Sequence, residues 1–247
     1  MALIVQKYGG SSLDDAAKIK NVARRIAATK EAGNEVVVVV SAMGNTTDEL
    51  IDLAQQISHR PQEREMDVLL STGEIISSTL VAMALRALGH EAISLSGAQA
   101  GIRTDNSYTR ARIRAIKPRR IISELERGSI AIVAGFQGMT EEMDITTLGR
   151  GGSDTTAVAV AASLGAEECE IYTDVDGIYT ADPHVVPQAC KLKTITYEEM
   201  LELASYGAKV IHPRAVELGE LYNIPILVAS SFTANPGTII HGGATMD

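Results

Sequence analysis

The segment Glu35-Val36-Val37-Val38-Val39-Val40 decides the fold. Five valines in a row are apolar on both faces of a strand, which is typical of a central strand in a parallel sheet with helices on both sides. Gly33, just before it, is a natural stop for the helix predicted over residues 14–32. That helix carries apolar side chains at helical spacing. A helix, a tight turn and a strand buried on both faces predict an α/β protein.

The same alternation continues along the chain. Further strands are expected at residues 2–5, 91–95, 129–134, 170–173, 225–229 and 238–240. Further helices are expected at residues 48–58, 62–88, 155–164, 197–204 and 214–221. Strands that alternate with helices over this length predict a three-layer αβα sandwich around a mostly parallel sheet.

Composition excludes several classes of protein. The 247 residues are 45% apolar and 21% charged, which is ordinary for one large globular domain or two small ones. Twenty-two basic against 31 acidic residues give a net charge of −9, so nucleic acid is not an expected partner. We find no signal peptide, and no apolar run approaches the ~20 residues of a membrane span. We therefore predict a soluble, cytoplasmic protein with no membrane partner.

Two cysteines, Cys169 and Cys190, are too few for a disulfide framework and lack the spacing of a metal site. We expect both to be small buried residues in a reducing compartment. The five histidines show no paired-ligand spacing, so no zinc site is predicted. The basic run at residues 110–120 is interpreted as a solvated face.

Glycines gather where predicted strands end, which is where ligands bind in open α/β sheets. After the first strand comes Lys7-Tyr8-Gly9-Gly10-Ser11-Ser12. Adjacent glycines let backbone amides approach an anion, the serines add hydroxyl donors, and the lysine could meet a phosphate. The segment is neither a P-loop nor a dinucleotide fingerprint. A plain turn with a solvated lysine is an equal alternative.

The stretch Gly149-Arg150-Gly151-Gly152-Ser153-Asp154 opens an alanine-rich helix. Ser153 or Asp154 could cap that helix, whose first N–H groups form an anion site. Arg150 offers a planar fork for a carboxylate or phosphate. Asp154 could be only a cap, or it could orient a lysine. Three glycines and an arginine exceed what a simple cap requires, which favours a functional role.

A third segment, residues 173–183, follows a strand and contains Tyr179 among several aspartates. It is either a polar loop with a packed tyrosine or a purine pocket whose carboxylates meet ribose or metal. Weaker candidates are Ser41 and Thr47, at the ends of the loop after the valine strand, and Lys209. Glu74 interrupts an apolar helix face, and a buried carboxylate there would need an ammonium partner.

Together these segments resemble the amino acid kinase family, and within it the enzymes that phosphorylate aspartate. The match is carried, in the family's order, by KYGGSS at 7–12, VVSAMGNTTDEL at 39–50, STGE at 71–74, GRGGSDTTA at 149–157, TDVDGIYTADP at 173–183 and YGAKVIHPRA at 206–215. These motifs span nearly the whole chain. Relatives that phosphorylate carbamate, acetylglutamate, glutamate or UMP share the fold but differ at these motifs.

The resemblance implies a role for each matching residue. Lys7 and Asp154 are the implied catalytic residues, with Lys7 stabilising the transferring phosphoryl group. The implied phosphate-binding residues are Gly9, Gly10, Ser11, Gly151, Gly152 and Ser153. The implied nucleotide-binding residues are Thr173, Asp174, Tyr179, Asp182, Lys209 and Val210. The implied acceptor-binding residues are Ser41, Thr47, Glu74 and Arg150, with Glu74 on the α-ammonium and Arg150 on the α-carboxylate of L-aspartate.

The resemblance further implies ATP with Mg²⁺, no protein-bound metal, and transfer of the γ-phosphoryl group to the β-carboxylate of aspartate. The chain would be one catalytic domain, with acceptor binding over about 1–150 and nucleotide binding over about 151–247. Family members normally continue into paired regulatory domains that bind lysine or threonine, and a homodimer is one possible assembly. We expect these domains to be missing here. A glutamate kinase and a non-catalytic sensor of ATP and aspartate are the alternatives.

Overall fold

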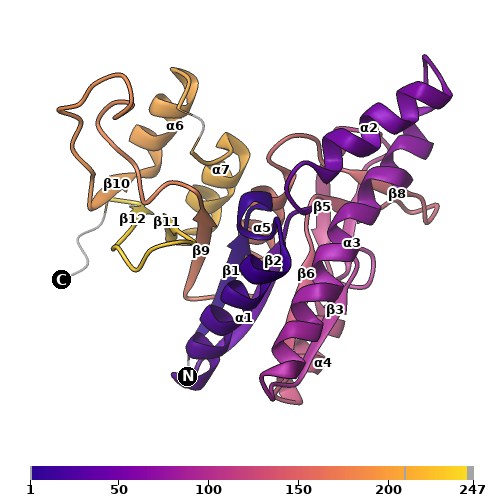
Figure 1. The fold of residues 1–247 in the computed structure, drawn as a ribbon, viewed down its shortest axis with the longest axis horizontal. Coiled ribbons are helices and arrows are strands. Elements are labelled where there is room, and N and C mark those ends of the chain that lie inside the picture. The colour runs from indigo at the N-terminus through magenta and orange to yellow at the C-terminus, as the bar shows by residue number, and fades with distance from the viewer. Residues whose placement is uncertain (1, 209, 244–247) are drawn as a thin grey trace.

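The computed structural model describes residues 2–208 and 210–243. Its centre is an eight-stranded sheet in the order β10-β12-β11-β9-β1-β2-β6-β3 (Figure 1). The strands are β10 (Thr194–Thr196), β12 (Thr238–His241), β11 (Ile226–Ser230), β9 (Glu168–Thr173), β1 (Leu3–Tyr8), β2 (Glu35–Val40), β6 (Ile130–Ala134) and β3 (Ala92–Leu95). All neighbouring pairs are parallel except β11 with β12. The predicted mostly parallel sheet is confirmed.

Strand β2 lies between β1 and β6 and is buried on both faces, as its five valines predict. Val37 and Val39 join one core cluster, and Val36, Val38 and Val40 join the other. The second cluster is completed by α1 (Ala16–Glu31) and α3 (Glu63–Ala87). The first is completed by α4 (Arg119–Glu126), α5 (Gly152–Leu164), α6 (Tyr197–Ser205) and α7 (Pro213–Tyr222). Since a fully buried valine contributes roughly 1.5–3 kcal/mol, this strand anchors both layers.

A second, four-stranded sheet was not predicted from the sequence. Its order is β5-β4-β7-β8, formed by β5 (Ile113–Ile116), β4 (Ile102–Thr104), β7 (Gln137–Met139) and β8 (Ile145–Thr147). Each strand has three or four residues and no long apolar run, so periodicity cannot reveal it. The interpretation of residues 110–120 as a solvated face is therefore wrong in part, because this run contains β5 and the start of α4.

The other predicted elements differ from the structure mainly at their ends. β1 continues beyond the predicted residues 2–5 to Tyr8, and a short 3₁₀ turn, η1 (Gly10–Ser12), follows it. The helix predicted at residues 48–58 is α2 (Thr46–Ile57). α5 begins three residues earlier than predicted, at Gly152. That difference matters because it places Ser153 and Asp154 inside the first turn.

Helix α3 corrects one prediction about membranes. By length and composition it is apolar enough to cross a membrane, whereas no such run was expected. Half of its most apolar stretch is buried inside the fold, where α3 contacts α1, β3, β6 and β8. It also buries two carboxyl groups, Asp67 and Glu74. These contacts describe a core helix.

The two cysteines differ from each other. Cys169 is buried in β9, as predicted, and burial holds the pKa of its thiol well above the usual value. Cys190 is exposed, which contradicts the prediction that both are buried. Both thiols are free.

The topology brings the glycine clusters together. β2 and β9 flank β1 on opposite sides, so the chain connections diverge at the carboxyl end of β1. Ligands bind at such switch points because the diverging connections leave a crevice between them. The segments that follow β1, β2 and β9 begin at Gly9, Ser41 and Asp174, and therefore share one edge of the sheet.

Candidate functional site

A cavity of about 380 Å³ opens at this edge. It is lined by all of the predicted catalytic, phosphate-binding and acceptor-binding residues and by Thr173. The predicted members are Lys7, Gly9, Gly10, Ser11, Ser41, Thr47, Glu74, Arg150, Gly151, Gly152, Ser153 and Asp154. The structure thus gathers residues that lie up to 166 positions apart in the chain, as between Lys7 and Thr173. Their individual roles stay predictions.

Lys7 and Asp154 form an ion pair inside the cavity. Lys7 Nζ, from the end of β1, lies 2.7 Å from Asp154 Oδ1, from the first turn of α5. Both side chains are largely buried, so the pair is screened less than a surface ion pair. Within the described residues, Oδ1 is paired only with this ammonium, as an ionic contact. The ion pair shows that the two groups meet, and the role of Asp154 in orienting Lys7 stays a prediction.

The start of α5 differs from the prediction that Ser153 or Asp154 caps it. The N-cap is Gly151, in the left-handed conformation with φ +69°, and no side chain caps the helix. A Cβ at Gly151 would lie 2.2 Å from the His212 ring, so only glycine fits there. The backbone N–H groups of the first turn are therefore left without a capping side chain, and such groups bind anions.

His212 holds this turn from the other side. Its backbone N–H donates to Asp154 Oδ2 at 3.3 Å, and its ring accepts the N–H of Arg214 at 3.3 Å through Nδ1. Burial lowers the pKa of the imidazole, which favours the neutral ring that this acceptor role requires. His212 was not predicted as a site residue, although it lies in the YGAKVIHPRA motif.

Glu74 is the second buried carboxylate of the cavity. One of its oxygens, Oε1, accepts the backbone N–H of Ala42 at 3.0 Å, and Oε2 has no hydrogen-bond partner within the described residues. Only 3% of the residue is exposed. Burial raises the pKa of Glu74 to about 7, against the lowering effect of the Ala42 N–H. The sequence predicts that this buried carboxylate needs an ammonium partner. The described part of the chain does not supply one.

The backbone around Glu74 is packed closely. A Cβ at Gly10 would lie 2.7 Å from the carbonyl oxygen of Ala42, so the loop after β1 touches the loop after β2. Ser77 Oγ donates to the carbonyl oxygen of Ser41 at 2.7 Å and ties α3 to the same loop. Arg150, at the mouth, is exposed and free to reach a ligand.

A second cavity of about 950 Å³ begins one residue beyond Thr173. It is lined by four of the predicted nucleotide-binding residues, Asp174, Tyr179, Asp182 and Val210. Thr173 lines the first cavity and its hydroxyl donates to Asp174 Oδ1 at 3.0 Å, which joins the two cavities. Lys209 lies outside the described residues. The predicted phosphate and nucleotide residues thus form two adjoining spaces.

Lys191, which the sequence did not single out, contacts a residue of the second cavity without lining the cavity itself. Tyr179 donates its hydroxyl to Asp176 Oδ1 at 2.9 Å, and Lys191 pairs with Asp176 Oδ2 at 3.2 Å. The Tyr179 hydroxyl, with help from Lys191, lowers the pKa of Asp176. This network orders the loop over residues 174–183. Lys191 could not be predicted, because a lone lysine between two loops carries no local signal.

The donor set does not form a metal cage. Among the described residues no three His, Cys, Asp or Glu side chains are grouped to hold a metal ion. Mg²⁺ at phosphoryl-transfer sites is usually held by the nucleotide phosphates and one or two carboxylates. Asp154, a carboxylate that lines the first cavity, fits that mode.

This cavity pair on an αβα sandwich defines the class of protein. The amino acid kinase family model matches residues 2–230, and the chain belongs to the amino acid kinase family. The expected family is confirmed.

Three similar proteins are named for one activity. The chain is 59% identical to the aspartokinase of Corynebacterium efficiens over 98% of its length and 58% of that protein. It covers 40% of the crystal structure of aspartate kinase from Synechocystis, with all of its residues aligned, 51% identity and a TM-score of 0.88. It is 27% identical to E. coli aspartokinase III in complex with aspartate and ADP, with a TM-score of 0.89, over 99% of this chain and 65% of that one. The chain spans less than two thirds of each.

Proposed function

We propose that this chain is the catalytic domain of an aspartate kinase. It transfers the γ-phosphoryl group of ATP to the β-carboxylate of L-aspartate and yields 4-phospho-L-aspartate and ADP, the first step towards lysine, threonine and methionine. The relatives' names and the complex of one relative with aspartate and ADP support this assignment. Residues 1–150 bind mainly the acceptor, and residues 151–247 bind mainly the nucleotide.

One observation carries the proposal. A single cavity holds a lysine–carboxylate pair, Lys7 with Asp154, and a buried carboxylate with an unpaired oxygen, Glu74. The first arrangement suits an anionic reaction centre, and the second suits a ligand with an ammonium group. An amino acid that receives a phosphoryl group needs both.

The chemistry requires positioning more than proton transfer. A carboxylate is already a nucleophile at pH 7, so no general base is needed. The barrier lies in bringing two anions together, and phosphoryl transfer is catalysed mainly by alignment and charge neutralisation. Lys7 and the uncapped N–H groups of α5 supply positive potential where the γ-phosphoryl group would lie. Asp154 keeps the Lys7 ammonium in place.

The acceptor end selects which carboxylate reacts. Glu74 binds the α-ammonium, Arg150 binds the α-carboxylate, and Ser41 and Thr47 add hydrogen bonds. With the head held, the β-carboxylate is left to face Lys7. A ligand without the α-ammonium leaves Glu74 unpaired, which costs about 1–3 kcal/mol or more.

The nucleotide end uses the second cavity. Asp174, Tyr179, Asp182, Lys209 and Val210 hold the nucleoside, and Thr173 lies at the passage to the phosphates. Asp154 is the carboxylate that would meet Mg²⁺ carried by ATP, and the metal would neutralise phosphate charge. We place the protein in the cytoplasm, as a possible homodimer whose regulatory regions lie in the remainder of a longer protein.

The test is ADP release coupled to a reporter, with Mg-ATP and either L-aspartate or L-glutamate as acceptor. We expect turnover with aspartate and, because glutamate is one methylene longer, roughly 10–200-fold less with glutamate. Lysine plus threonine should not inhibit. Faster turnover with glutamate would assign a glutamate kinase instead. Calorimetric binding of ATP and aspartate without ADP release would assign a sensor.

A further inference from the structure

A third cavity, of about 800 Å³, has a different lining from the two already described, and it meets the first where Leu148 and Thr155 adjoin Gly149 and Asp154. Its walls are strand β5, one face of α5 and one face of α7. None of the predicted site residues that the structure describes lines it. Its volume lies in the range of ligand sites, and nothing in the proposed reaction uses it. We call it the β5 groove.

The edge of a sheet faces this groove. β5 is the outermost strand of the small sheet and pairs only with β4. Six consecutive residues, 111–116, line the groove. A strand that presented one face would contribute only alternate residues, so consecutive lining indicates that the strand lies edge-on. Besides the pairing with β4, the backbone of Ile113–Ile116 forms no backbone hydrogen bond in the described part of the chain.

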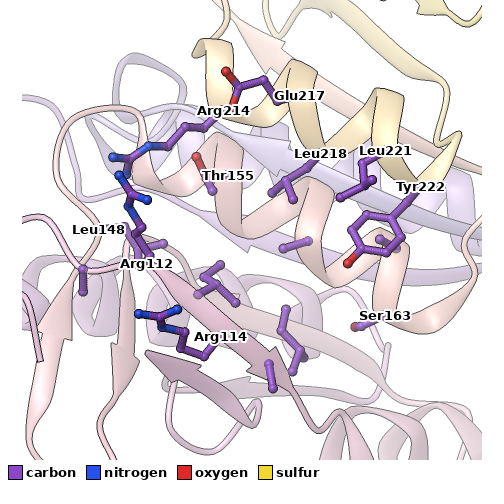
Figure 2. A pocket seen from close by; sticks show the side chains of 16 residues that line it. Arg112, Arg114, Leu148, Thr155, Ser163, Arg214, Glu217, Leu218, Leu221 and Tyr222 are labelled. Carbon is purple, nitrogen blue, oxygen red and sulfur yellow. The ribbon is translucent and has the colours of Figure 1, made fainter. Parts of the chain in front are cut away.

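Arginines supply the charge of the groove. Arg112 and Arg114, from the β5 segment, and Arg214, from α7, all line it. Figure 2 shows the Arg112 and Arg214 side chains pointing toward one another, and the carboxylate of Glu217 does not lie between their guanidinium groups. Among the described residues only Arg114 of the three has an ionic partner, Asp105 at 3.4 Å. Two guanidinium groups that converge without a carboxylate between them favour an anionic ligand.

The opposite wall is apolar. α7 contributes Leu218, Leu221 and Tyr222, whose side chains lie along the groove in Figure 2. Leu221 is 71% exposed and Tyr222 is 56% exposed. α5 adds the small residues Ala159 and Ala162, which leave room beside β5. Exposed leucine and tyrosine next to a free strand edge mark an interaction surface.

We propose that the β5 groove binds an extended acidic segment of another protein, which adds as a strand to the free edge of β5. Its backbone pairs with Ile113–Ile116, its alternate acidic side chains meet Arg112, Arg114 and Arg214, and its apolar side chains pack on α7. Strand addition divides recognition in this way, with backbone bonds for affinity and alternate side chains for specificity. The proposal is independent of the kinase activity.

Charge decides between this occupant and the others. A second copy pairing β5 with β5 would bring arginines of both copies together, and like charges opposite each other destabilise a strand pair. A small anion would use the arginines but neither the strand edge nor the apolar wall. Only an extended peptide with acidic and apolar alternation uses all three features.

The probe is a capped, fluorescein-labelled peptide of alternating glutamate and valine, titrated with the 247-residue protein and followed by fluorescence polarisation. We expect saturable binding and about tenfold weaker binding to Arg112→Glu, a change of ~1.4 kcal/mol. Arg119→Glu, on exposed α4 outside the groove, makes the same charge change and should bind as the parent does. Circular dichroism on both variants verifies that they fold.

Two further peptides test the strand edge. A peptide with lysine in place of glutamate should not bind, and one N-methylated on every backbone amide should lose binding, because neither of its edges has an N–H to donate to β5. Equal binding of the N-methylated peptide, an equal loss in Arg119→Glu, or absence of saturable binding would each overturn the proposal. Pyrophosphate binding that is lost in Arg112→Glu, without peptide binding, would assign the arginines to a small anion instead.

Discussion

Asp154 and Glu74 are both buried carboxylates in one cavity, yet the chain treats them differently. Asp154 pairs with Lys7 at 2.7 Å and also accepts the His212 N–H. Glu74 has one backbone N–H donor and one unpaired oxygen, and burial raises its pKa to about 7. The protein itself thus neutralises the carboxylate at the proposed phosphate end, whereas the carboxylate at the proposed acceptor end is left for charge that a ligand would bring. This difference organises the predictions below.

The largest effect is expected from removing the Lys7 ammonium, which is paired with Asp154. Lys7→Ala should lower kcat by about 10³-fold or more, since the charge that stabilises the transferring group is lost. The coupled ADP assay measures this. Lys18→Ala, which breaks the exposed Lys18–Asp14 pair, is the matched control and should keep its activity.

Lys7→Ala also leaves Asp154 with an unpaired charge, which destabilises a buried site. The double variant Lys7→Ala/Asp154→Asn removes both charges, so it should regain stability in thermal unfolding but not activity. Near-parental turnover in either variant would contradict the proposed role of Lys7.

The second-largest effect on activity is expected from a substitution of Glu74. Glu74→Gln should raise the aspartate KM by about a hundredfold, because the α-ammonium loses its counter-charge, and should leave the ATP KM unchanged. Glu63→Gln, at the exposed start of the same helix, is the control. A rise confined to the ATP KM would mean that Glu74 contacts ATP rather than aspartate.

Glu74→Gln should at the same time stabilise the empty protein. The pKa of Glu74 is about 7 when folded and 4.5 in the reference state, so the folded protein holds the extra proton between these values. The free energy of unfolding therefore falls as the pH rises from about 4.5 through 7. Glutamine does not ionise, so the free energy of unfolding of the variant does not fall in this way. Above pH 7 the variant should be more stable than the parent protein by up to about 3 kcal/mol. Urea unfolding at pH 5 and pH 8 measures the difference.

A smaller effect is expected from Arg150→Ala, because this side chain is exposed at the mouth. The aspartate KM should rise about tenfold to thirtyfold, with loss of a charged hydrogen bond to the α-carboxylate. Steady-state kinetics with each substrate varied in turn separates the two KM values. Arg119→Ala, far from the cavity, serves as the control, and a rise in the ATP KM alone would move Arg150 to the phosphates.

The smallest effect needs no mutation. Binding of the α-ammonium requires ionised Glu74, whose pKa is about 7 in the empty site. Aspartate should therefore bind about tenfold more weakly at pH 6 than at pH 8, with uptake or release of a proton visible in buffers of different ionisation enthalpy. Glu74→Gln should abolish this dependence. If the Glu74→Gln variant kept the pH dependence of aspartate binding, that dependence would belong to another titrating group.

Much of the fold and of the candidate site could be predicted because its signals are local. The five valines of β2 predict burial on both faces, and their alternation between two cores confirms it. The glycine-rich segments after β1 and before α5 mark a site through residue types alone, and the structure brings them to one cavity. The small sheet could not be predicted, because β4, β5, β7 and β8 are too short to show a periodic pattern.

By itself, the sequence determined the layered architecture, the family and the set of charged groups that share the cavity, since each depends on local apolar spacing or on a motif. Only the tertiary structure decided how those groups are partnered. Asp154 meets Lys7, and Glu74 meets only the Ala42 N–H among the residues that the structure describes. Gly151 rather than a side chain caps α5, and the basic run containing Arg112 borders a groove with α7. Pairing, burial and pKa arise from contacts between residues far apart in the chain, and no local pattern encodes them.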